Sequence, residues 1–126
     1  MNEIKLTENR SINEKFYTLH HESGLDIYVI PKKHSTAFAV FGTRYGSADR
    51  TFKLAGENDW LTVPDGVAHF LEHKMFEDED GDAFAKFAKT GANANAFTSF
   101  DRTCYLFTAT EQLDESLDVL LGMVGR

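Results

Sequence analysis

The order of apolar runs along the chain is the feature that most restricts its fold. Residues 16–20 and 25–30 read as two strands around a "HESG" turn, and residues 35–47 form a third run rich in small, β-branched and aromatic side chains. Two further strands, within "NAFTSF" and "TCYLFTAT", are joined by a turn at Asp101 and Arg102. With three helical segments between and after them, the order is β-β-β-α-α-β-β-α. This order predicts an α+β domain in which helices cover a largely antiparallel sheet.

Three segments have helical spacing. "PDGVAHFLEHKMF" places Val67, Phe70, Leu71 and Met75 near one face, with Asp65 as the predicted N-cap. "GDAFAKFAKTG" is a shorter helix predicted to begin at Asp82 and to end at Gly91. The last helix, in residues 110–126, has an apolar face made of Leu113, Leu117, Leu120, Leu121 and Val124.

The remaining segments lack a clean period. Residues 48–66 are predicted to form a loop, and residues 1–15 an extended tail. The acidic run at residues 77–82 lacks the spaced oxygen ligands and closing Glu of an EF-hand loop. We therefore expect a solvated helix boundary there instead of a calcium site.

Charge and cysteine content restrict the partners and the compartment. The net charge of −7 disfavours nucleic acids and anionic membranes, because both require a basic surface. No run of eighteen apolar residues is present, so no transmembrane helix is expected, and the N-terminus lacks the apolar core of a secretory signal. The single cysteine, Cys104, cannot form an internal disulfide, which fits a reducing environment. These features predict a cytoplasmic protein, and the length of 126 residues predicts one compact domain.

The segment "HFLEH", residues 69–73, carries the strongest chemical signal. On a helix, His69 and His73 lie one turn apart on the same face and can converge on one metal ion. Glu72 lies beside them, where it can accept a proton from a bound water instead of ligating the ion. The pattern H-x-x-E-H suits metal-assisted hydrolysis of a carbonyl compound. The alternative is a surface histidine pair with a nearby Glu, although the apolar flanks favour a metal as the partner of these polar groups.

A wider stretch has a specific resemblance. "DGVAHFLEHKMFE", followed by "GANANAFTSFDRTCYLF", resembles the insulinase-type zinc peptidases, which include pitrilysin and the mitochondrial processing peptidases. The earlier "GLDIYVIPK" and "RYGSADR" are similar to the first strands of the same domain, so the resemblance runs from about residue 16 to the end and is closest to bacterial cytoplasmic members.

The resemblance implies roles for individual residues. His69 and His73 would bind Zn²⁺, and Glu72 would be the base that activates water. An edge strand containing Asn95, Ala96 and Phe97 would pair with the substrate backbone.

One part of the family's pattern is missing. The third zinc ligand, a Glu on a later helix, would fall beyond Arg126. The acidic and imidazole side chains inside the chain are poor substitutes: Glu77, Glu111, Glu115, His20, His21 and His34. The resemblance therefore implies that residues 1–126 are a partial N-terminal catalytic domain, a truncated form with weak zinc binding and little activity.

The predicted function is a zinc-dependent endopeptidase acting on peptides or small unfolded polypeptides. The family also implies a possible homodimer or paralogous partner subunit. One alternative is a catalytically silent scaffold subunit of a peptidase complex. Another is a metal enzyme similar to the S-ribosylhomocysteine lyases, in which Cys104 would be the third ligand.

Overall fold

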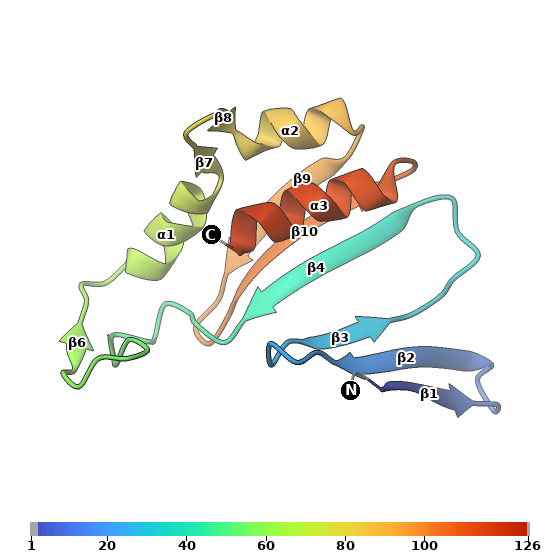
Figure 1. The fold of residues 1–126 in the computed structure, drawn as a ribbon, viewed down its shortest axis with the longest axis horizontal. Coiled ribbons are helices and arrows are strands. Elements are labelled where there is room, and N and C mark those ends of the chain that lie inside the picture. Colours follow the sequence, from blue (N-terminus) through green and yellow to red (C-terminus); the bar gives the residue numbers. More distant parts are fainter. Residues whose placement is uncertain (1–2, 126) are drawn as a thin grey trace. The chain divides into compact units, whose positions relative to one another are not determined.

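The chain divides into two compact units. A computed structural model describes residues 3–125 and divides into Met1–His34 and Ser35–Arg126 (Figure 1). Each unit builds its own antiparallel sheet, and the strands of each sheet hydrogen-bond to one another within that unit. The predicted α+β class with largely antiparallel sheets is confirmed.

The N-terminal unit is a three-stranded meander. It contains β1 (Ile4–Asn9), β2 (Glu14–His20) and β3 (Asp26–Val29), in the order β1-β2-β3. The predicted hairpin is confirmed as β2 and β3, but the predicted tail at residues 1–15 is wrong, because β1 pairs along its whole length with β2. The sequence "IKLTEN" has a clear alternation only at its start, which is why its pairing was missed.

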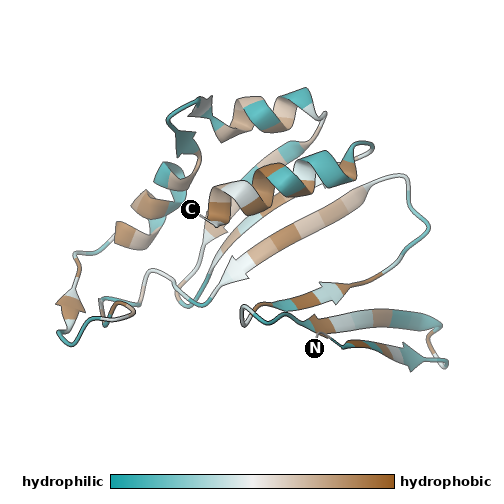
Figure 2. Ribbon diagram, viewed as in Figure 1, coloured by the Kyte–Doolittle hydropathy of each residue, from teal (hydrophilic) through white to brown (hydrophobic). Residues whose placement is uncertain are grey.

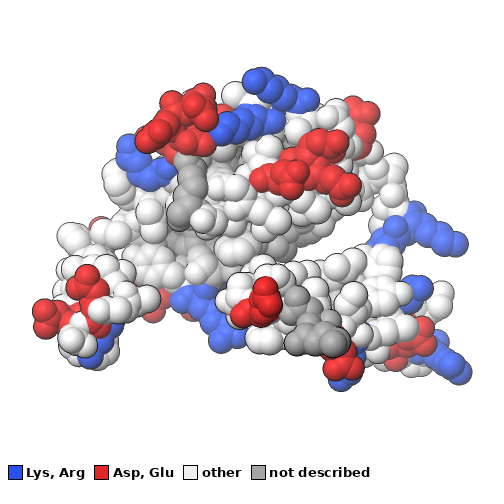
Figure 3. Space-filling view, in the orientation of Figure 1, with Lys and Arg blue, Asp and Glu red and all other residues white. Residues whose placement is uncertain are grey.

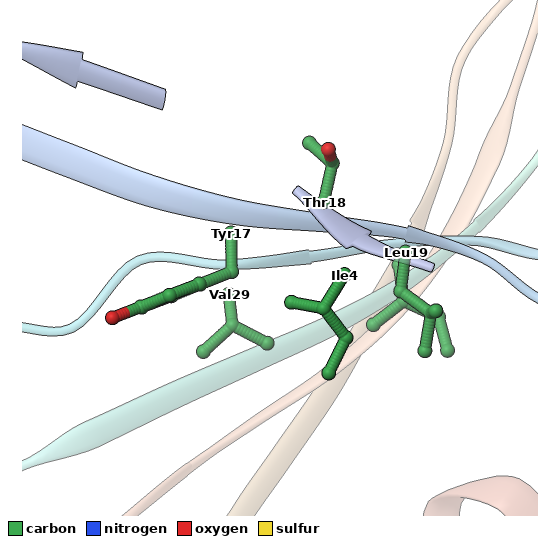
Figure 4. A pocket seen from close by; sticks show the side chains of 6 residues that line it. Ile4, Tyr17, Thr18, Leu19 and Val29 are labelled. Carbon is green, nitrogen blue, oxygen red and sulfur yellow. The ribbon is translucent and has the colours of Figure 1, made fainter. Parts of the chain in front are cut away.

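One face of this meander is apolar. A hollow of about 270 Å³ lies on it, and the side chains around it come from all three strands (Figure 4): Ile4, Tyr17, Thr18, Leu19, Ile27 and Val29. The hollow has no carboxylate, imidazole or thiol in its lining. It therefore offers apolar contact and no group for acid–base or metal chemistry.

The second unit is built on a three-stranded antiparallel sheet. The strands β4 (Ala37–Thr43), β10 (Thr103–Ala109) and β9 (Asn93–Thr98) have the order β4-β10-β9, so β9 lies at an edge. Alternate residues of β10, Tyr105, Phe107 and Ala109, are buried in the core. These three strands match the predicted ones.

Two helices cover the core face of this sheet. Helix α3 (Leu113–Val124) packs on β10 and β4, and α2 (Ala83–Lys89) packs on β9 and α3 (Figure 1). Asp82 caps α2 as predicted, since its carboxylate accepts a hydrogen bond of 2.8 Å from the Phe84 N–H. The rings of Phe87 and Phe107, both almost fully buried, lie 5.8 Å apart at the centre of the core.

The buried face of α3 differs from the prediction. Leu113 and Leu121 are exposed, while Ser116 and Met123 are buried with Leu120. Ser116 is accommodated because its hydroxyl donates to the Thr90 hydroxyl at 2.8 Å, which in turn donates to the Phe87 carbonyl at 2.8 Å. A fully hydrogen-bonded hydroxyl costs little to bury, so this helix face is less apolar than its leucines suggest.

Two short ladders occupy segments predicted to be irregular. β5 (Thr51–Phe52) pairs with β6 (Leu61–Thr62) inside the predicted loop. β7 (Glu77–Asp78) pairs with β8 (Gly81–Asp82) at the acidic run. Figure 3 shows acidic side chains gathered over β7 and β8 with basic ones beside them, consistent with the ion pairs from Lys74 to Glu77 and from Lys86 to Asp78.

The turn between β9 and β10 is packed tightly against Gly46. The N–H groups of Ser47 and Ala48 donate to the carbonyls of Ser99 and Phe100, each at 2.9 Å. A Cβ at Gly46 would lie 2.4 Å from the Ser99 carbonyl oxygen and 2.5 Å from the Arg102 nitrogen. This turn follows directly from the edge strand, so its fixed position also fixes the end of β9.

Gly46→Ala is therefore expected to lower the free energy of unfolding by about 2–3 kcal/mol, because backbone atoms cannot move aside as a flexible side chain can. Urea unfolding followed by circular dichroism measures the change. Gly122→Ala is the matched control, since a Cβ there meets nothing within 4 Å on α3. Equal stability of the two variants would contradict the close packing at Gly46.

Candidate metal centre

The helix that carries "HFLEH" is α1 (Val67–Met75), as predicted. Its N-cap is Gly66, not Asp65. Gly66 has a φ of 87°, in the left-handed region that favours glycine, and no side chain caps the helix. Asp65 instead forms an ion pair with Arg50, with 3.1 Å between Nε and Oδ1. His73 and Lys74 lie in the last turn, where positive charge is compatible with the helix dipole.

On α1 a charged side chain is buried and large apolar side chains are exposed, the reverse of what its apolar residues predict. Glu72 is only 7% exposed and faces inward with Ala68, whereas Phe70 is 62% and Leu71 43% exposed. The helix contacts β9, and the α1 ribbon in Figure 2 carries both hydrophobic and hydrophilic residues along its length. Burying a carboxylate in preference to Phe and Leu is costly unless the carboxylate has partners. A hydrogen-bond partner for the buried Glu72 carboxylate is therefore expected.

The two histidines converge through their outer nitrogens. Nε2 of His69 lies 3.0 Å from Nε2 of His73, and the ring centroids are 4.8 Å apart. Two imidazoles that bind one tetrahedral zinc at about 2.0–2.1 Å need their nitrogens about 3.3 Å apart. A small rotation of either ring gives this separation, so the histidine pair fits a zinc ion. Both rings are exposed, which leaves the metal side open.

Glu72 lies beside the histidine pair, and its carboxylate accepts a hydrogen bond from a residue of β9. The Thr98 hydroxyl, at the end of β9, donates to Glu72 Oε2. The same oxygen is 4.0 Å from His69 Nδ1, too far for a hydrogen bond. Burial, and secondarily the Glu72 carboxylate, raises the pKa of the nearby Tyr105 hydroxyl above its usual 10.0. Tyr105 is therefore a neutral phenol beside this carboxylate at neutral pH.

The free edge of β9 lies next to α1 in the fold. Ser99 N–H donates to the Arg102 carbonyl at 2.8 Å, and the alternation of an antiparallel ladder then turns the backbone groups of Ala94 and Ala96 away from β10. The Ala96 N–H donates to the Asn95 side-chain oxygen at 2.8 Å. Asn95 and Phe97 are exposed on this strand. The predicted strand is confirmed, and its role with a substrate stays a prediction.

A third ligand is not present among residues 3–125, in which no group of three or more His, Cys, Asp or Glu side chains is arranged to hold a metal ion. Glu77 pairs with Lys74, and the exposed Glu111 and Glu115 lie at and near the start of α3. Cys104 is buried on β10, on the opposite face from Tyr105, so it does not join the histidine pair.

Thr98 and Tyr105 were missed by the sequence reasoning. Both lie on the face of the sheet that α1 approaches, and Thr98 is two residues beyond Ala96, hence on the same side of β9. That spacing in "NAFTS" was available from the sequence. Its connection to Glu72 was not, because it joins residues 26 positions apart.

Comparisons with known proteins show which family the chain resembles. The profile of "Insulinase (Peptidase family M16)" matches residues 62–125, which include α1, β9, β10 and α3. The "Uncharacterized zinc protease YmfH" of Bacillus subtilis (strain 168) is 50% identical over 122 residues, covering 96% of this chain and 28% of that protein. The "Putative zinc protease AlbF" of the same strain is 27% identical, covering 89% of this chain and 26% of its own length.

The fold is shared with a solved structure. A crystal structure of a "putative M16-like peptidase" from Alicyclobacillus acidocaldarius superposes with a TM-score of 0.83 and 40% identity, covering 95% of this chain and 27% of that one. The chain thus shares the α+β fold of an M16-like peptidase. The chain belongs to the insulinase family, peptidase family M16. It spans about a quarter of the length of these relatives. Among residues 3–125 no helix is long and apolar enough to cross a membrane.

Proposed function

We propose that this chain carries part of the catalytic centre of a zinc-dependent endopeptidase. The observation that carries the proposal is the pair of converging Nε2 atoms beside a buried, hydrogen-bonded carboxylate. His69 and His73 would hold the ion, and a further ligand would come from outside residues 3–125. Bound zinc would supply a Lewis acid and lower the pKa of water to about 7.

Glu72 would be the general base and then the general acid. Its carboxylate accepts a proton from the attacking water and later gives that proton to the departing amine nitrogen as the C–N bond breaks, so the carboxylate is regenerated. The low exposure of Glu72 supports this role, because a carboxylate shielded from bulk water exchanges protons mainly with groups held next to it.

The edge strand β9 would bind the substrate. Backbone groups of Ala94 and Ala96 that turn away from β10 can pair with an extended peptide, and the side chains of Asn95 and Phe97 would contact it. Main-chain pairing demands an extended conformation and little particular sequence. Peptides and small unfolded polypeptides are therefore the substrate class that we propose.

The compartment and the assembly are also proposals. The single, buried and unpaired Cys104 fits a protein of the reducing cytoplasm. A second copy of the chain or a paralogous subunit is the partner that we propose. A silent scaffold subunit is the competing outcome and is distinguished by the following experiment.

The test is metal removal from the protein at its natural full length. Treatment with 1,10-phenanthroline is expected to abolish hydrolysis of a quenched fluorescent peptide, and stoichiometric Zn²⁺ is expected to restore it, because the water loses its activation with the ion. Zinc per chain is measured in parallel by atomic absorption. Hydrolysis that survives removal of the metal would contradict the proposal. Zinc-loaded protein that fails to hydrolyse peptides, alone or mixed with a paralogue, would favour the scaffold.

A further inference from the structure

We propose that Thr98 is a positioning residue, whose hydroxyl fixes the Glu72 carboxylate in the orientation needed for proton transfer. The inference rests on the proposed function of Glu72. It adds a link between the helix that carries the histidines and the strand that would hold the substrate, since Thr98 is the last residue of β9.

The contact is specific to one carboxylate oxygen. The Thr98 hydroxyl donates to Oε2, and among the described residues no other side chain hydrogen-bonds the Glu72 carboxylate. Oε1 is thereby left for a water molecule. His69 Nδ1 lies 4.0 Å from Oε2, beyond hydrogen-bond distance. Without the hydroxyl, the carboxylate is free to turn toward that imidazole.

Thr98 itself is well held. It is a β-branched residue in a strand, which restricts its χ1 angle. Its cross-strand neighbour is Thr103. The backbone of the next residue, Ser99, donates a hydrogen bond to the Arg102 carbonyl and accepts one from the Ser47 N–H. The position of the Thr98 hydroxyl is therefore restricted, whereas the Glu72 side chain has three rotatable bonds. A fixed donor on a flexible carboxylate restricts the orientation of the carboxylate.

The test compares Thr98→Val with Thr98→Ser in the protein at its natural full length. Val has the shape of Thr without the hydroxyl, so kcat for a fluorescent peptide is expected to fall by about 10- to 100-fold. KM and zinc per chain are expected to stay within about twofold, because neither the strand edge nor the histidines change. Ser retains the hydroxyl and is expected to retain most of kcat.

Thr103→Val is the matched control. Thr103 is the cross-strand neighbour of Thr98, is buried, and donates to the Tyr45 carbonyl at 2.8 Å. Its replacement removes a comparable hydroxyl without touching Glu72, so stability is expected to fall while kcat does not. An equal loss of kcat in Thr98→Val and Thr103→Val would overturn the positioning role, as would normal kcat in Thr98→Val.

A stability cycle in metal-free protein gives a readout independent of activity. Unfolding midpoints are measured for Thr98→Val, Glu72→Ala and the double variant. If the two side chains are bonded, the double variant is expected to shift by a different amount from the sum of the single shifts. Additive shifts would overturn the contact. Coupled shifts in a protein that hydrolyses no peptide would leave the contact standing and remove the proposed function, and the positioning role with it.

Discussion

Replacing Glu72 with Gln is expected to lower kcat for peptide hydrolysis by about 10³-fold while zinc per chain stays the same. The amide has nearly the shape of the carboxylate and can still accept the Thr98 hydroxyl hydrogen bond, so the fold of α1 is retained. It cannot accept a proton from water. The measurement is steady-state hydrolysis of a fluorescent peptide, with metal analysis of the same sample.

The control for this substitution is Glu77→Gln. Glu77 is exposed, four residues beyond His73, and pairs with Lys74. Loss of this surface charge is expected to change kcat by less than about twofold, since an exposed ion pair contributes little. A Glu72→Gln variant with near-normal kcat would exclude this residue as the base. A variant that has lost its zinc would indicate that Glu72 ligates the ion instead.

Replacing His73 with Ala is expected to remove bound zinc from the full-length protein, from about one ion per chain to a trace after desalting, because a catalytic site has only three protein ligands. Hydrolysis is expected to disappear with the metal. His20→Ala is the control, since His20 is an exposed imidazole paired with Asp26 in the N-terminal meander. Atomic absorption after desalting gives the comparison directly.

The 126-residue chain alone is the second part of this experiment. With two converging imidazoles and no third ligand arranged among residues 3–125, it is expected to retain little zinc. Near one zinc per chain, lost in His73→Ala, would contradict the missing third ligand. It would mean that a neighbouring copy or an unrecognised side chain completes the site.

The strands and helices were largely predictable, and the reasons are local. Alternation identified β3, and short apolar, β-branched and aromatic runs between turn residues identified β2, β4, β9 and β10. Asp82 was correctly placed as a helix cap. The tail at residues 1–15 was mispredicted because the pairing of β1 depends on a partner strand more than on its own composition. The N-cap was mispredicted by one residue: it is Gly66, in the left-handed region, and Asp65 pairs with Arg50.

The residue types of the site were predictable from the sequence, but which residues of α1 are buried was not. Helical spacing alone brings His69 and His73 together, and the structure has them converging. The same spacing predicted that Phe70 and Leu71 would face the core, whereas Glu72 does. The buried Glu72 carboxylate accepts a hydrogen bond from the Thr98 hydroxyl, a contact between elements that no local pattern contains. Whether these residues bind zinc and substrate stays a prediction until the metal is measured.

The hydrogen bond from the Ala96 N–H to the Asn95 side-chain oxygen affects self-association of the chain at high protein concentration. An open strand edge is a template for pairing with any other chain, including copies of itself at high concentration. An incoming strand must first displace this amide, so it exchanges one hydrogen bond for another and gains less per residue. The edge is thus partly sealed against self-association and fibre growth, yet it can be opened by a polypeptide that adds side-chain contacts of its own.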